Sequence, residues 1–167
     1  MTKRSFLTVI ATAALAIVPA AFGADTSALN VTVGPEATFA SAFSATTLTA
    51  ADTKFGGFAG TTNFTYKIRT TLSGGTGAIT VQVSTFGTGG PAVADLSYTC
   101  TAPSSGTPCG SSTPASTGTA TNVVAFGADA HSADTGDAGT AVWALVDRTG
   151  VQTGSYSSTA TFTISAL

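Results

Sequence analysis

The stretch from Gly154 to Leu167 constrains the fold most, because its side chains alternate in kind at every second residue. One parity, starting at Tyr156, is mainly apolar, and the other consists of serine and threonine from Ser157 to Ser165. Successive side chains of a β-strand point to opposite faces, so this pattern predicts a strand with one apolar and one hydroxyl face. Such an apolar face must be covered by a second layer.

Similar alternation recurs along the chain between glycine-rich turns. The clearest runs are Thr62 to Thr71 and Ile79 to Val83, separated by the turn at 73–77. We expect these two runs to pair as an antiparallel hairpin, with Lys67 and Arg69 on its solvent face. Further runs lie at Leu29–Val33, Glu36–Thr49, Leu96–Cys100, Val123–Phe126 and Ala141–Val146. No helical spacing follows the N-terminal segment, so the sequence predicts an all-β chain, a sandwich of seven to eight strands rather than a barrel.

The N-terminal segment has the features of a cleavable signal peptide. Lys3 and Arg4 precede an apolar run from Phe6 to Val18, and small residues follow it. We expect cleavage after Gly23, or alternatively after Ala20. The run is too short to cross about 30 Å of hydrocarbon, so we do not expect a membrane anchor.

Removal of residues 1–23 leaves residues 24–167, which we expect to form a single domain. This domain would pass through the periplasm and reside outside the cell or on its surface. The sequence after this segment contains no second long apolar run, so we do not expect membrane insertion. Its four basic and eight acidic residues give a formal charge of −4, and no basic cluster occurs, which excludes nucleic acid as an expected partner.

The closing stretch resembles the last strand of secreted bacterial immunoglobulin-like domains, above all spore coat protein U domains and chaperone–usher pilins. The shared features are G-x-Y followed by T-x-T-F-T-I, with Gly154 holding the place of a pilin glycine. The chain differs in having Ala166 where pilins carry an aromatic residue, and in its cysteines, which lie mid-chain. The resemblance implies an immunoglobulin-like antiparallel sandwich.

The same resemblance implies a mode of assembly, in which a subunit receives a strand from the N-terminal extension of its neighbour. Leu29, Val31 and Val33 alternate with polar residues and are the candidates for such a donor. The alternative is that they form the first strand of their own domain, and this is the interpretation that we favour. A periplasmic chaperone is a further partner that the resemblance implies.

Cys100 and Cys109 are the only cysteines. Disulfides persist outside the cytoplasm, and the intervening prolines and glycine allow the chain to turn back. A redox pair is more often spaced C-x-x-C, and a zinc site needs more ligands. We therefore expect a structural disulfide.

An acidic loop contains Asp129, Asp134 and Asp137 together with His131, the only histidine. Three carboxylates are candidate ligands of Ca²⁺, but the D-x-D-x-D-G spacing of a calcium loop is absent. A solvated loop is the interpretation that we favour, so we expect no cofactor. Asp134-Thr135-Gly136 matches the aspartic-protease triplet, yet it occurs once and in a polar loop, so we expect no protease site there.

Carbohydrate binding would need exposed aromatic residues as stacking platforms. The candidates lie on strand parities assigned to the core, so we expect them to be buried; they are Tyr66, Tyr98, Trp143 and Tyr156. No convergent set of acids, bases and nucleophiles is evident. The sequence therefore predicts a secreted, non-enzymatic structural subunit that associates with itself or with other surface proteins. The alternative is a carbohydrate-binding or adhesive module.

Overall fold

The computed structural model describes residues 27–51, 53–102 and 105–167, and the expected signal peptide lies outside them. Within these residues the chain is all-β, with ten strands and one short 3-10 turn, η1 (Val93–Asp95). The strands are β1 (Glu36–Phe39), β2 (Thr49–Ala50), β3 (Phe58–Arg69), β4 (Gly77–Val83), β5 (Leu96–Thr101), β6 (Thr107–Pro108), β7 (Thr113–Pro114), β8 (Thr121–Phe126), β9 (Asp137–Leu145) and β10 (Ala160–Ala166). Seven to eight strands were expected; the additional ones are two residues long.

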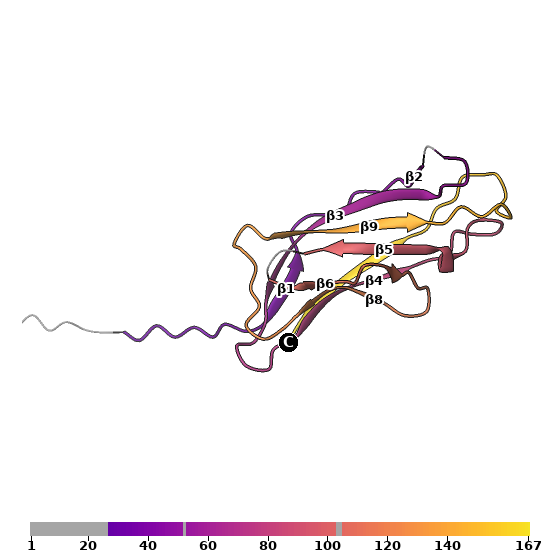
Figure 1. Ribbon diagram of the computed structural model, residues 1–167. Helices are drawn as coiled ribbons and strands as arrows, with labels where there is room; N and C mark the ends of the chain where they lie inside the picture. Colours follow the sequence, from indigo (N-terminus) through magenta and orange to yellow (C-terminus); the bar gives the residue numbers. More distant parts are fainter. Residues whose placement is uncertain (1–26, 52, 103–104) are drawn as a thin grey trace, which may run out of the picture. The chain divides into compact units, whose positions relative to one another are not determined.

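The strands form two antiparallel sheets (Figure 1). Sheet A has the order β1, β3, β9, β5 and β7, with β2 as a second partner of the same edge of β3. Sheet B has the order β10, β4, β8 and β6. The apolar faces of both sheets contribute to a single buried core, so the expected β-sandwich is confirmed at the level of two packed antiparallel sheets.

The core follows from the period-2 alternation of the strands. Along β3 the side chains of Phe64, Tyr66 and Ile68 are buried, whereas those of Lys67 and Arg69 are exposed, as the sequence predicts. The core residues from the other strands are Ile79, Val81, Val83, Leu96, Tyr98, Val123, Val124, Phe126, Ala141, Trp143 and Leu145, joined by Ala115.

The predicted hairpin between β3 and β4 is wrong, because the two strands belong to different sheets. Alternation shows only that each strand has one apolar face. Two such strands satisfy this equally well side by side in one sheet or face to face in two. The chain crosses between the sheets after Arg69, where buried Thr70 donates its hydroxyl to the carbonyl of Gly127 (2.7 Å) and accepts from the N–H of Ala130 (2.9 Å). These two hydrogen bonds fix the position of the chain where it passes from sheet A to sheet B.

The expected strand at Leu29–Val33 is also not formed, since residues 27–35 contain no strand. Leu29 and Val31 are 95% and 86% exposed. The first strand of the domain is instead β1, which follows Pro35 and pairs with the end of β3. The interpretation of Leu29, Val31 and Val33 as the domain's own first strand is therefore wrong for the single chain.

The closing strand is shorter than predicted. β10 begins at Ala160, and the preceding residues from Gly154 form a loop. Tyr156 is half-buried in this loop and donates its hydroxyl to the carbonyl of Gln152 (2.9 Å), so its side chain bonds within the loop. From Thr161 onward the predicted alternation is confirmed, with Thr161, Thr163 and Ser165 exposed and Phe162, Ile164 and Ala166 half-buried, whereas Ala160 is exposed.

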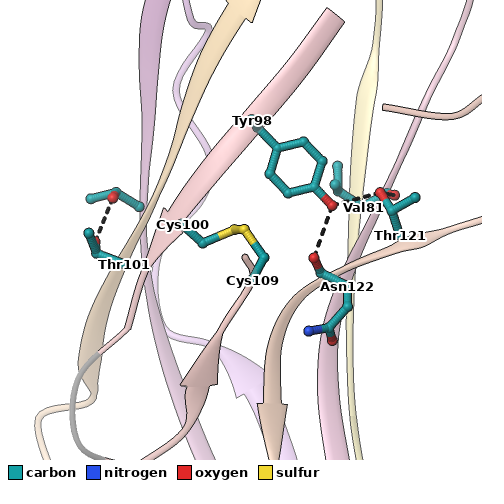
Figure 2. The surroundings of a disulfide bond; sticks show 8 residues. Val81, Tyr98, Cys100, Thr101, Cys109, Thr121 and Asn122 are labelled. Carbon is teal, nitrogen blue, oxygen red and sulfur yellow. Dashed lines mark hydrogen bonds between the residues drawn. A yellow bond between two sulfur atoms is a disulfide. The ribbon is translucent and has the colours of Figure 1, made fainter. Parts of the chain in front are cut away.

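The predicted disulfide between Cys100 and Cys109 is confirmed (Figure 2). Cys100 lies in β5 of sheet A, and Cys109 directly follows β6 of sheet B. The bridge therefore joins the two sheets, on the side of the sandwich away from β10. Beside it, Tyr98 reaches across from sheet A and donates its hydroxyl toward Thr121 Oγ1 (2.6 Å) and the carbonyl of Asn122 (3.0 Å) in β8.

Removing the disulfide should destabilise the domain. Replacing both cysteines by alanine frees a ten-residue loop in the unfolded chain, and we expect the free energy of unfolding to fall by about 2.5–3 kcal/mol. Urea denaturation of the parent and the double variant measures this difference. The parent unfolded under reducing conditions is the control and should match the variant. Equal stability of oxidised parent and variant would contradict the structural role.

Alkaline pH should destabilise the fold through two buried tyrosines. Burial raises the pKa of Tyr66 and of Tyr98 above the ordinary 10.0. The unfolded chain therefore loses these protons first, and the free energy of unfolding should fall as the pH rises above about 10. Urea denaturation between about pH 9 and 11 tests this, with Tyr66→Phe/Tyr98→Phe showing a shallower decline. Identical declines in both proteins would count against the prediction.

Candidate functional site

One edge of β10 has no partner among the described strands. On its other side, the N–H of Ser84 donates to the carbonyl of Thr159 (2.9 Å), and the N–H of Leu167 donates to the carbonyl of Thr76 (2.7 Å). Backbone groups alternate sides along an antiparallel strand, so the odd-numbered residues of β10 bond to β4. The N–H and C=O groups that point to the open edge are those of Ala160, Phe162, Ile164 and Ala166.

The strand itself has none of the features that protect an edge from further pairing, namely charge, proline, a bulge or very short length, although β1 lies close to β10 without pairing with it. β10 is seven residues long and contains only alanine, threonine, serine, isoleucine and phenylalanine. The other edges are protected. β6 and β7 are short and each contains a proline, and β1 is short, begins with Glu36 and follows Pro35. β10 is the edge best suited to accept another strand.

The inward side chains along β10 are only partly covered. Phe162, Ile164 and Ala166 pack against the core but remain half-buried. Phe43 covers part of this face, because its ring stacks on that of Phe162 with a centroid distance of 4.6 Å and an interplanar angle of 15°. Phe43 comes from the irregular segment between β1 and β2, residues 40–48.

Segment 40–48 runs beside the edge of β3 without forming a strand. Its close approach depends on Gly60, where a Cβ atom would lie 2.7 Å from the carbonyl oxygen of Thr47. Thr46 Oγ1 lies 2.6 Å from Thr62 Oγ1, which also accepts a hydrogen bond from Nε1 of Trp143 (2.8 Å). This chain of hydrogen bonds attaches the segment to the core and satisfies the buried indole.

A cleft of about 600 Å³ opens where β3 and β10 begin and β4 and β9 end. Its walls come from segment 40–48, from both sheets, and from the loops before β5 and β10. None of the described residues that line it is charged. They are Phe43, Ser44, Ala45, Thr46, Thr47, Leu48, Phe58, Thr62, Val83, Phe86, Pro91, Leu96, Trp143, Leu145, Gly154, Tyr156, Ser157, Ser158, Ala160 and Phe162.

The three candidate calcium ligands are not brought together. Asp137 accepts hydrogen bonds from the hydroxyl of Ser105 (2.5 Å) and the N–H of Ala133 (3.2 Å), so its carboxylate is engaged within the fold. Asp129 lies 3.6 Å from Nδ1 of His131, and Asp134 is exposed in the loop before β9. Among the residues that the structure describes, no three such side chains are placed to hold a metal ion.

The aromatic candidates for sugar stacking point mostly inward. Tyr66, Tyr98 and Trp143 are buried, as the sequence predicts, and only Tyr156 is half-buried at the cleft. Phe43 and Phe86 line the cleft but were not identified as site residues from the sequence. Phe43 is four residues after Phe39, so in an extended strand both side chains would lie on the same, apolar face. This pattern predicts that Phe43 is buried, but it does not distinguish a position in the core from one in the wall of a cleft.

Comparison of the chain with models of known protein families, with characterised proteins and with solved structures gave no match. Over the described ranges, no helix has the length and apolar character needed to cross a bilayer.

Proline substitutions at adjacent positions of β10 test the assignment of its open edge. Ser165→Pro removes an N–H that bonds to β4 and should lower the free energy of unfolding by about 1–3 kcal/mol. Ala166→Pro removes an N–H that points to the open edge, and proline is tolerated there, so we expect a much smaller change. Urea denaturation of both variants gives the comparison. A larger loss for Ala166→Pro would show that the two sides of β10 have been exchanged.

Proposed function

We propose that the chain is a secreted, non-enzymatic structural subunit with an immunoglobulin-like sandwich, which associates with further copies by strand addition at β10. The observation that carries this proposal is the unpaired edge of β10, with four N–H and four C=O groups and a half-buried apolar face beside it. An added strand would satisfy these backbone groups and cover Phe162 and Ile164.

The chain itself contains a segment suited to be the added strand. Leu29, Val31 and Val33 are spaced by two residues, so in an extended conformation their side chains lie on one face. All three are exposed, and they belong to no strand of their own chain. Burial of each such side chain in a neighbouring copy would stabilise the contact by roughly 1.5–3 kcal/mol.

The positions of the two features support head-to-tail assembly. The chain enters the domain at the end where Arg69 lies, since Nε of Arg69 donates to the carbonyl of Gly34 (2.9 Å). The cleft beside β10 opens at the opposite end, around Phe58 and Ala160. A segment that leaves one end of a subunit and binds toward the other end of the next makes a heterologous contact, and such contacts extend into filaments unless they close into a ring.

Export is part of the same proposal. The expected signal peptide and the disulfide are both consistent with a protein outside the cytoplasm, where disulfides persist. An open apolar edge also invites incorrect pairing during export, so a periplasmic chaperone that covers β10 before assembly is an expected partner. Other surface proteins with a similar donor segment would compete for the same edge.

Deleting residues 24–34 tests the proposal. The deletion removes Leu29, Val31 and Val33 but no described strand, so we expect a folded protein that stays monomeric while the parent assembles. Sedimentation velocity and negative-stain electron microscopy distinguish the two. A synthetic peptide of residues 27–35 should bind the truncated protein, and the same peptide with serine at all three apolar positions is the matched control.

Two outcomes would contradict strand donation. One is assembly of the truncated protein to the same extent as the parent. The other is a truncated protein that fails to fold and is not restored by the peptide, because that result would make residues 24–34 part of the domain's own fold.

A further inference from the structure

We propose that the cleft at the start of β10 is a binding site for an uncharged molecule with a hydrocarbon body. This inference goes beyond self-association. A strand added along β10 would bond to its backbone edge and would also cover Phe162, which belongs to the cleft lining, so the ligand is proposed for the single chain before assembly. The volume of about 600 Å³ lies within the range of small-molecule sites in proteins.

The walls favour an apolar ligand. Six aromatic residues line the cleft, together with Leu48, Leu96 and Leu145. Those six are Phe43, Phe58, Phe86, Trp143, Tyr156 and Phe162. Sites for small ligands have this character, with apolar and aromatic walls and only a few polar groups.

Most of the polar groups in the walls already have partners within the protein. Thr62 Oγ1 accepts from the indole of Trp143 and lies within hydrogen-bond distance of Thr46 Oγ1. The hydroxyl of Tyr156 donates to the carbonyl of Gln152, and that of Ser158 donates to the carbonyl of Ser84 (2.6 Å). A ligand therefore has few hydrogen bonds to complete in the interior.

The residues that line the cleft also determine whether a ligand can carry a charge. None of the described lining residues carries a charge. An ionised group that entered the cleft would lose hydration without gaining a counter-charge, which is strongly unfavourable. The structure therefore selects against charged ligands and for neutral ones.

Two fluorescent probes with one ring system test the ligand class on the processed chain. N-phenyl-1-naphthylamine is neutral, whereas 8-anilinonaphthalene-1-sulfonate adds a negative charge. We expect the neutral probe to bind saturably at one molecule per chain and the anionic probe at least tenfold more weakly. Trp143 is the only tryptophan and lines the cleft, so excitation energy should pass from it to the bound probe. Equal binding of both probes, or no saturable binding, would overturn the proposal.

Matched substitutions locate the bound probe. Phe86→Ala removes a wall of the cleft and should weaken binding roughly tenfold, whereas Phe55→Ala alters an exposed phenylalanine that does not line it. Ser157→Asp places a charge at an exposed lining position and should also weaken binding, whereas Ser155→Asp, two residues earlier in the same loop and outside the lining, should not. Equal effects within either pair would contradict the site.

The Ala166→Pro variant separates this proposal from strand addition. It removes one of the four N–H groups on the open edge of β10 but leaves the lining of the cleft intact, so probe binding should be unchanged while assembly is weakened. Loss of probe binding in this variant would place the probe at a contact between subunits and overturn the proposal. Assembly as strong as that of the parent, with unchanged probe binding, would instead count against strand addition alone.

Discussion

The packing of the apolar face of β3 against sheet B is the interaction on which the rest of the structure depends. The ring of Phe64 lies beside that of Phe162 in β10, the ring of Tyr66 beside that of Phe126 in β8, and both belong to the core that Ile79 and Val81 of β4 help to form. β9 and β5 extend the first sheet from β3, and β8 and β10 flank β4 in the second. Both sheets are therefore positioned by this contact, and the hydroxyl-bearing side chains face outward as its consequence.

The sequence predicted the faces of the strands well but not their partners. Alternation correctly indicated which side chains of β3 and β10 are buried, because a period of two reports directly on the two sides of a strand. The same pattern cannot distinguish a hairpin from two strands in opposed sheets, so the pairing of β3 with β4 was predicted incorrectly. Leu29 to Val33 has a strand-like pattern too, but a strand requires a partner strand, and residues 27–35 pair with none of the described strands.

The open edge and the cleft could not be predicted from the sequence, for a similar reason. The sequence indicates that Phe162 and Ile164 lie on the apolar face of their strand. It does not indicate that β10 is an edge strand, because this depends on the order of strands in sheet B. The cleft is assembled from residues as distant in sequence as Phe43 and Tyr156, and segment 40–48 has no regular periodicity. The disulfide was predictable because the sequence indicates export and its two cysteines leave a single pairing.

The scarcity of charge has a consequence for the conditions under which such a protein can work. The ion pair Arg69–Glu36 is exposed and Arg148–Asp95 is partly exposed, and dissolved salt weakens the attraction between charges most where they are exposed. The core, the open edge and the cleft rely on apolar burial and backbone hydrogen bonding, which electrostatic screening scarcely affects. The fold and its contacts should therefore keep much the same strength in fresh water and in brine.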